Sequence, residues 1–501
     1  MSEHRLIDSI AGSMADLAEF RKLGHESIDL VADYLGNIRS TPVFRPMTPA
    51  ERDRLREQRL PAEGTAADVI IDDFAQDVLP FAMGNGHPRF FGWVNSPPAP
   101  IGILAEMLAA AQDPSCDVGD ISSLYLEQAV VGWLTEIVGY DPETAMGLLV
   151  SGGSVAILTG LAVARQHCAE ADGWDVRADG VAGAGGKRLL TYVTDQTHSS
   201  VRKGIELLGL GSSSVRVVPT DDMFRMDPDA LARMVARDRA DGHRPFCVVA
   251  SAGTTNTGAI DPFDRIADVA AEHALWLHVD GAYGAVGALH PQLADAYAGL
   301  RRADSIALDP HKWLSVPVEC GCVIVRDREL MRRTFSLVPP YLRTEEGKGV
   351  GGPPSFAEYG IQQTRGFRAL KVWMTLRHAG RRGLTDQVVR HVALARHLAA
   401  MVAETPALEL VVPPQLSVVC FRYLPSDGDR DPTRVDAINE LVERRVQAEG
   451  RAFLTSTVLR DRFVLRASVL HYATTEDDLR ALLHIVCTAG ATAERELTRE
   501  S

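Results

Sequence analysis

Through residues 86–330, short runs of consecutive apolar residues alternate with longer stretches whose apolar positions recur at helical spacing. The runs are rich in β-branched and aromatic residues: LLTYVT (189–194), VRVV (215–218), FCVVA (246–250), LWLHVD (275–280), SIALD (305–309) and CVIVR (322–326). Strands that alternate with helices predict an α/β fold with a mostly parallel central sheet flanked by helices. Because the runs are apolar on consecutive residues, we expect both faces of that sheet to be covered.

The pattern changes at both ends of the chain. Residues 7–37 and 48–59 place apolar side chains at helical spacing among charges, which predicts an N-terminal helical segment over 1–85. Toward the C-terminus, helical stretches alternate with the apolar runs LSVVCFRYL and RFVLRASVL, which predicts a small α+β domain over 376–501. The large α/β domain then covers 86–375.

Length, composition and charge narrow the function classes. The 501 residues suffice for two to four domains, and 46% hydrophobic with 24% charged residues is ordinary for a globular protein. Lys plus Arg number 52 and Asp plus Glu 66, so the formal net charge of −14 disfavours nucleic acid and anionic membranes as partners. The N-terminus MSEHRLIDSIAGSMADLAEF mixes charges into its apolar positions, unlike a secretion signal, and no apolar run approaches the ~20 residues of a membrane span. We therefore expect a cytoplasmic protein.

The chain has seven cysteines, and only Cys320 and Cys322 lie close together. Their Cys-Gly-Cys spacing is too short for a usual zinc knuckle. We therefore expect free, buried thiols and no metal site.

Polar residues follow several of the predicted strands or stand at the start of a predicted helix, at the sheet edge where open α/β folds collect their ligands. The first group, Ser151-Gly152-Gly153-Ser154, directly precedes the helix-forming run VAILTGLAVAR. Glycines let a ligand approach the backbone, and the free N–H groups of a helix's first turn suit a phosphate. The segment is neither a GxGxxG fingerprint nor a P-loop, which counts against dinucleotides and ATP. An ordinary glycine-rich turn would look the same, so this motif alone decides nothing.

The other groups contribute an acid, an amine and an imidazole. Asp280 ends the run LWLHVD, Lys312 follows SIALD, and His198 follows LLTYVT. One βα unit of about 30 residues separates Asp280 from Lys312, so neighbouring strands could direct both side chains into one crevice. Taken singly, a helix-capping Asp, a solvated Lys and a structural His would each explain these residues.

Together, the phosphate turn, the strand-end acid and the lysine meet the three requirements of pyridoxal 5'-phosphate. The cofactor needs its phosphate bound, its pyridine nitrogen kept protonated by a carboxylate, and an amine for its Schiff base. We therefore expect this cofactor at the predicted sheet edge.

The chain resembles the group II pyridoxal-phosphate decarboxylases, the aromatic L-amino acid decarboxylase family. Ten segments match in family order: EFRKLGHESIDLVADYL, HPRFFGW, VSGGS, DQTHSSV, SAGTTNTGAIDP, LHVDGAYG, DPHKW, PPYLR, GFRALKVW and RFVLRAS. The resemblance implies a type I, aspartate aminotransferase-like fold and decarboxylation of an L-amino acid to an amine and carbon dioxide. It also implies a homodimer in which the N-terminal segment wraps the partner and the active site lies at the interface.

The resemblance implies roles for individual residues. Lys312 matches the Schiff-base lysine, and Asp280 matches the acid that pairs with the pyridinium nitrogen. His198 and Ala282 match the residues on the two faces of the cofactor ring. The further cofactor contacts that it implies are Gly153 and Ser154 at the phosphate, Thr254 and His311.

Tyr341 lies in PPYLR, just before the glycine- and proline-rich stretch RTEEGKGVGGPPS (343–355), which we expect to form a mobile loop. The tyrosine matches the loop residue that protonates the substrate carbon after carbon dioxide leaves. By its sequence context alone it would be taken for a surface tyrosine.

The substrate-facing segment departs from the family pattern. Trp93-Val94-Asn95-Ser96 stands where aromatic-specific relatives commonly show Tyr-Phe-Pro-Thr, so a smaller aliphatic side chain replaces one aromatic wall. We take Trp93, Val94 and Ser96 as candidates for substrate binding. Val155 replaces the glutamate usual after the phosphate serine, and nothing in the sequence explains that change. An aromatic substrate is the first expectation, and valine, leucine or methionine the second.

Three other functions compete with simple decarboxylation. An aldehyde synthase would alter the loop tyrosine or the stacking histidine, whereas Tyr341 and His198 are both present. An aminotransferase would need an arginine clamp for the α-carboxylate, and no segment matches one. A catalytically silent binding protein would not need Lys312, Asp280 and Tyr341 together. We therefore expect a decarboxylase, with the aldehyde synthase as the alternative.

Overall fold

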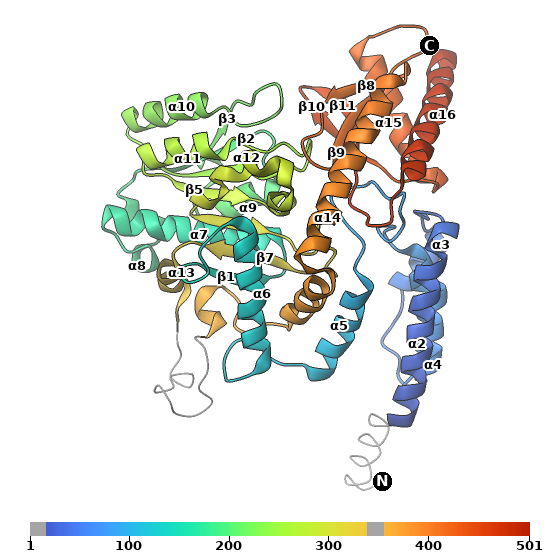
Figure 1. Cartoon of the computed structure of the whole chain (residues 1–501), viewed down its shortest axis with the longest axis horizontal. Coiled ribbons are helices and arrows are strands. Elements are labelled where there is room, and N and C mark those ends of the chain that lie inside the picture. The colour runs from blue at the N-terminus through green and yellow to red at the C-terminus, as the bar shows by residue number, and fades with distance from the viewer. Residues whose placement is uncertain (1–16, 338–354, 501) are drawn as a thin grey trace.

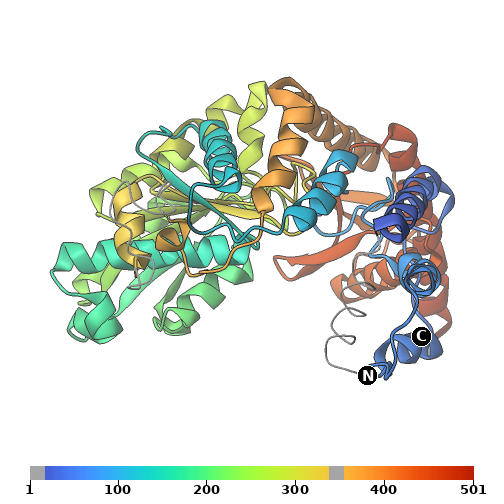
Figure 2. The same ribbon diagram turned by 90° about the horizontal axis from the view of Figure 1, so that it is seen from below.

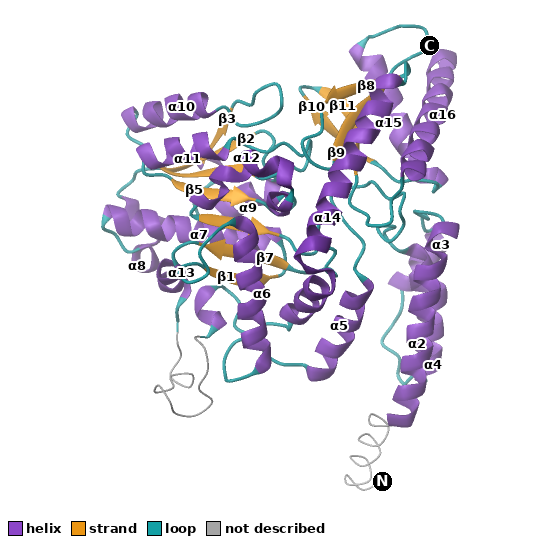
Figure 3. Ribbon diagram, in the orientation of Figure 1, coloured by secondary structure: helices purple, strands orange, loops and turns teal. Residues whose placement is uncertain are grey.

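Two sheets and an N-terminal group of helices make up the computed structural model, which describes residues 17–337 and 355–500 (Figure 1). The larger sheet and its covering helices form one end of the molecule. The smaller sheet and the N-terminal helices lie together at the other end, and the view turned by 90° shows the same division (Figure 2). In Figure 3 the strands form two separate groups, each bordered by helices.

In the described residues the larger sheet has seven strands in the order β1-β7-β6-β5-β4-β2-β3. They are β1 (Met146–Val150), β2 (Leu189–Thr194), β3 (Val215–Val218), β4 (Arg244–Ser251), β5 (Trp276–Asp280), β6 (Ser305–Leu308) and β7 (Gly321–Val325). β7 runs antiparallel to β1 and β6, and the other neighbouring pairs are parallel. The predicted mostly parallel sheet is confirmed, and each of the six predicted runs overlaps a strand.

The strand register brings the carboxyl ends of the parallel strands to one edge of this sheet. Val150, the last residue of β1, pairs with Gly321, where β7 begins. Asp280, the last residue of β5, pairs with Ala307 near the end of β6. The loops that follow β1, β4, β5 and β6 therefore meet at this edge, where α/β sheets bind their ligands.

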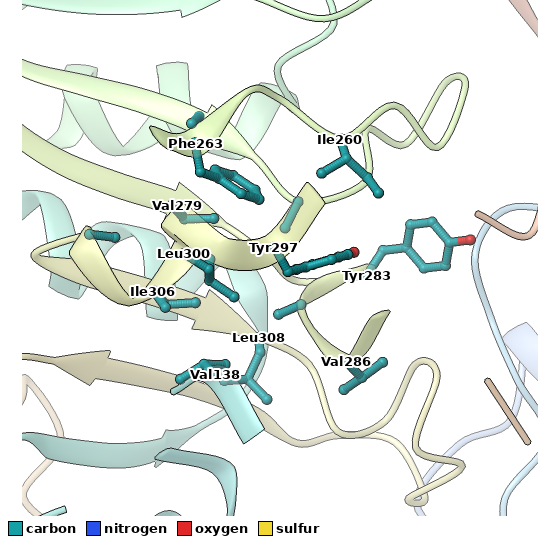
Figure 4. Packing of buried hydrophobic residues seen from close by; sticks show 14 of the residues in the cluster. Val138, Ile260, Phe263, Val279, Tyr283, Val286, Tyr297, Leu300, Ile306 and Leu308 are labelled. Atoms are coloured by element: carbon teal, nitrogen blue, oxygen red, sulfur yellow. The ribbon is translucent and has the colours of Figure 1, made fainter. Parts of the chain in front are cut away.

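Both faces of the larger sheet are covered, as the consecutive apolar runs predict. In β6, Ile306 and Leu308 belong to one buried cluster and Ala307 to another, because neighbouring residues of a strand point to opposite faces. Figure 4 shows the first cluster, where Phe263 and Tyr297 pack over the strands. The covering helices are α6 (Ser122–Val138), α10 (Pro228–Ala240), α11 (Phe263–Glu272) and α14 (Arg368–Glu404) on this face, and α7 (Gly153–Asp172), α9 (Ser199–Leu207) and α13 (Arg328–Phe335) on the other.

The smaller sheet is antiparallel, and its described strands follow the order β10-β11-β9-β8. Its strands and helices are β8 (Leu408–Val412), β9 (Val418–Tyr423), α15 (Pro432–Glu449), β10 (Thr455–Leu459), β11 (Arg462–Ser468) and α16 (Glu476–Glu500). The predicted small α+β unit is confirmed. The domain boundaries at residues 85 and 375 stay predictions, and α14 runs across the second of them with a kink at Gly380.

The N-terminal helices bury very little of themselves in this chain. α2 (Leu17–Asn37), α3 (Pro49–Arg56) and α4 (Ala67–Asp73) contain no buried residue. Arg39 and Arg89 attach this end of the chain to the small domain, since both guanidinium groups bind Asp478 in α16, at 3.2 and 3.0 Å. After Arg89 the chain continues into α5 (Pro100–Gln112). The exposed large apolar side chains in and beside α2 and α4 are Leu17, Phe20, Ile28, Val69, Ile70, Phe74 and Val78.

A buried ion pair ties the segment before α14 to the larger sheet. The guanidinium of Arg365 donates to the carboxylate of Glu127 in α6 and, at 2.8 Å, to the carbonyl of Leu149 in β1. Glu127 also accepts the N–H of Leu149 at 3.0 Å, and both charged side chains are only 1% exposed. Because a buried charge is costly without its partner, the pair fixes this segment against β1.

The seven cysteines are free and all except Cys487 are buried, as predicted. Burial raises the pKa of Cys320 to about 12, so this thiol stays protonated and unreactive at neutral pH. Within residues 17–337 and 355–500, no helix is both long and apolar enough to cross a bilayer.

Candidate active site

A cavity of about 370 Å³ lies at the carboxyl edge of the larger sheet. The loops after β1, β2, β4, β5 and β6 form its wall, so segments far apart in the sequence converge there. All eight residues predicted to contact the cofactor line it: Gly153, Ser154, His198, Thr254, Asp280, Ala282, His311 and Lys312. The structure thus brings the predicted set together, while the role of each member is still a prediction.

Lys312 stands on the loop between β6 and β7, and its neighbours hold that loop in place. Trp313 is fully buried, stacks on Tyr283 and donates from Nε1 to Nδ1 of His391 in α14 at 2.9 Å. From another direction, the hydroxyl of Ser96 donates to the carbonyl of Lys312. The lysine therefore extends its side chain into the cavity from a fixed backbone.

The turn between β1 and α7 presents backbone N–H groups to the cavity. The carbonyl of Gly152 accepts the first helical bonds, from Val155 and Ala156, so the preceding N–H groups have no partner within the helix. Gly153 is required by space, because a Cβ there would lie 2.8 Å from Oδ2 of Asp309. The predicted phosphate turn is therefore the start of a 20-residue helix, where the helix dipole stabilises an anion.

Asp280 and His198 reach the cavity from neighbouring loops. The buried carboxylate of Asp280 accepts the N–H of Ala282 at 3.2 Å. His198 caps α9, where its Nδ1 accepts the N–H of Ser200 at 3.3 Å. Burial lowers the pKa of His198 below its ordinary value, although Asp280 opposes that shift. The imidazole is therefore neutral at pH 7 and offers a flat uncharged face to the cavity.

His311 and Thr254 belong to loops that are closed by their own hydrogen bonds. Nδ1 of His311 accepts the N–H of Cys320 at 3.1 Å, and burial lowers the pKa of this imidazole as well. The hydroxyl of Thr254 lies 2.9 Å from Oγ1 of Thr257 and accepts the N–H of Ala259 at 3.2 Å. These bonds make both residues part of a rigid wall.

The three substrate candidates do not line this cavity. Trp93 is 45% exposed and packs against Phe90 and Phe453, with ring centroids 5.9 and 5.4 Å apart. Val94 is buried in the core, and the hydroxyl of Ser96 is committed to the lysine loop. Their contact with substrate stays a prediction.

Tyr341 and residues 343–354 of the predicted loop lie outside the described part of the chain. The described residues resume at Ser355, whose hydroxyl accepts the N–H of Ala357 at the start of a short helical turn. The role of Tyr341 stays a prediction.

Comparison with known proteins identifies the family. The pyridoxal-dependent decarboxylase conserved domain matches residues 49–424 of this chain. An aromatic-L-amino-acid decarboxylase from Bacillus atrophaeus is 33% identical over 471 residues, which cover 93% of this chain and 95% of the relative. The chain belongs to the pyridoxal-dependent decarboxylase family.

Two further comparisons place this decarboxylase among structures and activities. The crystal structure of Oryza sativa TDC with PLP and tryptamine is similar with a TM-score of 0.88 and 28% identity, and covers 95% of this chain and 99% of the other. A phenylacetaldehyde synthase from Petunia hybrida is 28% identical over 469 residues, with 91% of each chain covered. The predicted fold, the pyridoxal 5'-phosphate cofactor and the carboxy-lyase class are thereby confirmed.

The residues of the cavity fit the decarboxylase cofactor. The free N–H groups at the start of α7 suit its phosphate, the carboxylate of Asp280 suits a pyridinium nitrogen, and Lys312 supplies the amine. The cavity is also within the size range of small-molecule sites. One residue does not fit this assignment, because Asp309 places a negatively charged carboxylate beside the turn that is predicted to bind a phosphate.

Pyridoxal phosphate, when bound, supplies an electron sink for the pair that remains on the substrate carbon as carbon dioxide leaves. The protein binds the cofactor and orients it relative to the substrate. Lys312 is predicted to be the attachment point, and the carboxylate of Asp280 to favour positive charge in the ring. His198 and Ala282 both line the cavity, and they are predicted to contact the two faces of the ring.

Asp309 and Gln196 are among the residues of the cavity wall that were not predicted. Asp309 directly follows β6, just as Asp280 ends β5, so the signal that singled out the first acid also marked the second. Gln196 accepts from Nδ2 of Asn256 at 3.1 Å, a contact between distant loops that no local pattern reveals.

Proposed function

We propose that this decarboxylase acts on an aromatic L-amino acid of the tryptophan, tyrosine, phenylalanine or DOPA type and releases the amine and carbon dioxide. The observation that carries the proposal is the convergence of Lys312, Asp280 and His198 in one cavity of a pyridoxal-dependent decarboxylase. Together these side chains supply an amine, an acid and a flat neutral ring around one small space.

An aromatic substrate is supported from two sides. The relative from Bacillus atrophaeus is an aromatic-L-amino-acid decarboxylase, and the Oryza sativa structure holds tryptamine. In this chain, Trp93 packs in an aromatic cluster with Phe90 and Phe453 and keeps part of its indole exposed. The same segment reaches the lysine loop through Ser96, so this indole is available to pack against an aromatic side chain near the cavity.

Within this function we assign the predicted roles to the residues that line the cavity. Lys312 holds the cofactor, Asp280 faces its ring nitrogen, and Gly153 with Ser154 binds its phosphate. Tyr341 protonates the substrate carbon. The remaining cofactor contacts are His198, Ala282, Thr254 and His311.

Aldehyde formation is the second candidate function, since the Petunia hybrida relative is a phenylacetaldehyde synthase. The two functions differ in what happens to the substrate carbon after carbon dioxide leaves. Protonation gives an amine, whereas oxidative deamination consumes oxygen and gives an aldehyde, ammonia and hydrogen peroxide.

The substrate is tested by carbon dioxide release from each of the twenty amino acids and DOPA, with mass spectrometry of the product and an oxygen electrode. We expect the aromatic substrates to exceed valine, leucine and methionine by tenfold or more in kcat/KM, with an amine product and no oxygen uptake. Faster turnover of an aliphatic or thioether substrate would overturn the aromatic assignment. Stoichiometric oxygen uptake with aldehyde would favour the second candidate.

The role of Tyr341 is tested with Tyr341→Phe, which removes only the hydroxyl. The variant should bind substrate as the parent does but form amine slowly, or form aldehyde in its place. Tyr472→Phe, which alters an exposed tyrosine of the small domain, is the matched control. Unchanged amine formation by Tyr341→Phe would contradict the assigned role.

We also propose that the enzyme works as a homodimer, with the N-terminal segment against the partner and the active site near the interface. The exposed apolar side chains of α2, α4 and α5 support this arrangement, since single chains rarely leave so many together. The seven free cysteines support a reducing compartment such as the cytoplasm.

A further inference from the structure

Asp309 is a buried acid at the predicted phosphate turn. Its side chain is 3% exposed, and Oδ2 lies 3.0 Å from Nζ of Lys312. Oδ1 is buried and has no hydrogen-bond partner among residues 17–337 and 355–500. A Cβ at Gly153 would come within 2.8 Å of Oδ2, and one at Gly321 within 2.9 Å of Oδ1. The carboxylate is therefore enclosed by the glycine backbones at the start of α7 and of β7.

Of the charged and titratable groups that face this carboxylate, one forms a close ion pair with it. From its own loop, Lys312 pairs with Oδ2, and Nε2 of His311 lies 3.9 Å from the same oxygen. His198 on the α9 side and the thiols of Cys320 and Cys322 at β7 also interact with it electrostatically. Burial keeps His311 and His198 neutral and both thiols protonated, so only the lysine carries positive charge.

A cofactor phosphate at this turn meets an unfavourable charge arrangement. Among the described residues of this chain that line the cavity, Lys312 is the only lysine or arginine. That amine is the group that attaches the cofactor, so it is not free to neutralise a phosphate as well. Two anions in a buried space repel strongly unless a proton lies between them.

We propose that Asp309 and the cofactor phosphate share a proton that the enzyme takes up from solvent when the phosphate binds. The O–H of the carboxyl group then donates to a phosphate oxygen, which satisfies the oxygen that lacks a partner in the free protein. No covalent bond changes and one proton leaves solvent for each phosphate bound. Asp309 thereby makes cofactor affinity depend on pH. The inference rests on the phosphate position assigned above and is independent of the amino acid decarboxylated.

The test compares the parent enzyme with Asp309→Asn, a variant of the same shape that carries an N–H donor and no titratable proton. Cofactor is removed, and the dissociation constant of pyridoxal 5'-phosphate is measured by fluorescence titration between pH 6 and 9. Proton uptake makes affinity fall as pH rises, so the parent should lose about tenfold more affinity per pH unit than the variant. Calorimetry in two buffers of different ionisation enthalpy should show about one more proton taken up by the parent.

Pyridoxal, which has the aldehyde but no phosphate, is the probe that isolates the phosphate. With pyridoxal, parent and variant should show the same pH dependence. Asp477→Asn, which removes an exposed carboxylate in α16, should behave as the parent with both probes. Asp309→Ser provides a second variant if the amide disturbs folding.

Two results would overturn the inference. Parallel pH profiles of the parent and Asp309→Asn with pyridoxal 5'-phosphate would show that no proton is linked to this acid. A difference that persists with pyridoxal would show that Asp309 acts through Lys312 and not on the phosphate. Neither result would bear on the substrate, so failure here is distinct from failure of the proposed function.

Discussion

At the edge of the larger sheet the chemically active side chains lie at strand ends or on the loops that follow them, among buried neighbours, whereas the N-terminal helices α2, α3 and α4 contain no buried residue. Lys312 illustrates the first region, because Trp313, Ser96 and His391 hold its loop from three sides. Phe20 illustrates the second, with 71% of its surface exposed.

The contrast shows that one chain forms the whole described cavity wall by itself but leaves the apolar faces of its N-terminal helices exposed. The residues that line the cavity lie at the strand ends of one closely packed sheet and on the loops that follow them. The strand register therefore determines where these residues meet. Within the described residues the apolar faces of the N-terminal helices lack an equivalent core, and the proposed dimer would supply one. Substitutions at the cavity should therefore affect activity or the stability of the single chain, whereas substitutions in the N-terminal helices should affect the proposed dimer.

The largest effect is expected from Lys312→Ala. Loss of the amine should lower decarboxylation by about a thousandfold or more and abolish the visible absorbance of the lysine-bound cofactor. Oligomeric state should not change, because the substitution leaves the exposed apolar side chains of α2 and α4 in place. Lys187→Ala, on an exposed loop, is the control, and substantial activity in Lys312→Ala would disprove the assignment.

Arg365→Met tests how firmly the cavity region is held. The change leaves Glu127 charged and buried without its partner, which should cost about 3–5 kcal/mol of unfolding free energy. Chemical denaturation measures the loss. The double variant Arg365→Met, Glu127→Leu removes both charges and should recover much of it. A single variant as stable as the parent would mean that this pair does not fix the segment before α14.

The N-terminal region is tested with the double variant Phe20→Ser, Phe74→Ser. If these side chains are buried against a partner subunit, the dimer should dissociate at least tenfold more readily in sedimentation, because each buried phenylalanine contributes about 1.5–3 kcal/mol. Leu207→Ser removes an exposed leucine at the end of α9 and serves as the control. Unaltered sedimentation of the double variant would place the interface elsewhere.

The smallest effect concerns acid stability of the cavity region. Burial lowers the pKa of His391 to about 3, against 6.5 for the free side chain, and its Nδ1 accepts the Trp313 N–H in the neutral form. The unfolded chain binds a proton more readily here, so stability falls as pH drops from 6.5 towards 3. Between pH 6.5 and 5 the parent should lose roughly 1–2 kcal/mol that His391→Gln does not lose. Equal slopes in urea titrations would contradict this.

The strands show where local pattern was sufficient. β2 and β3 match their predicted runs residue for residue, because apolar β-branched residues and flanking turns define them locally. β1 was missed although MGLLV is largely apolar, since its short run begins beside a glycine. In β8 (LELVV) a glutamate interrupts the apolar run, so the local pattern does not mark a strand. The segment is a strand because it pairs with β9.

At the site, the sequence predicted eight of the residues that line the cavity, because strand ends and family motifs mark them. The sequence did not show that Trp93 packs against Phe453, which lies far along the chain. It did not show that Ser96 would bond to the lysine loop either. Such contacts depend on how the small domain and the 86–96 segment meet, and no local period encodes that.

Helix α14 has a mechanical consequence for the reaction centre. Its second half packs in the core of the small domain, yet two of its side chains reach back to Trp313: Nε2 of Gln387 donates to the tryptophan carbonyl at 2.7 Å, and His391 accepts from the indole. The residue beside the lysine is thus bonded to the part of α14 that follows the kink at Gly380, and this part packs in the buried clusters of both sheets. A tilt of the small domain would therefore move this helix segment and, through Trp313, the loop that carries Lys312. The large and small domains thus position the lysine together.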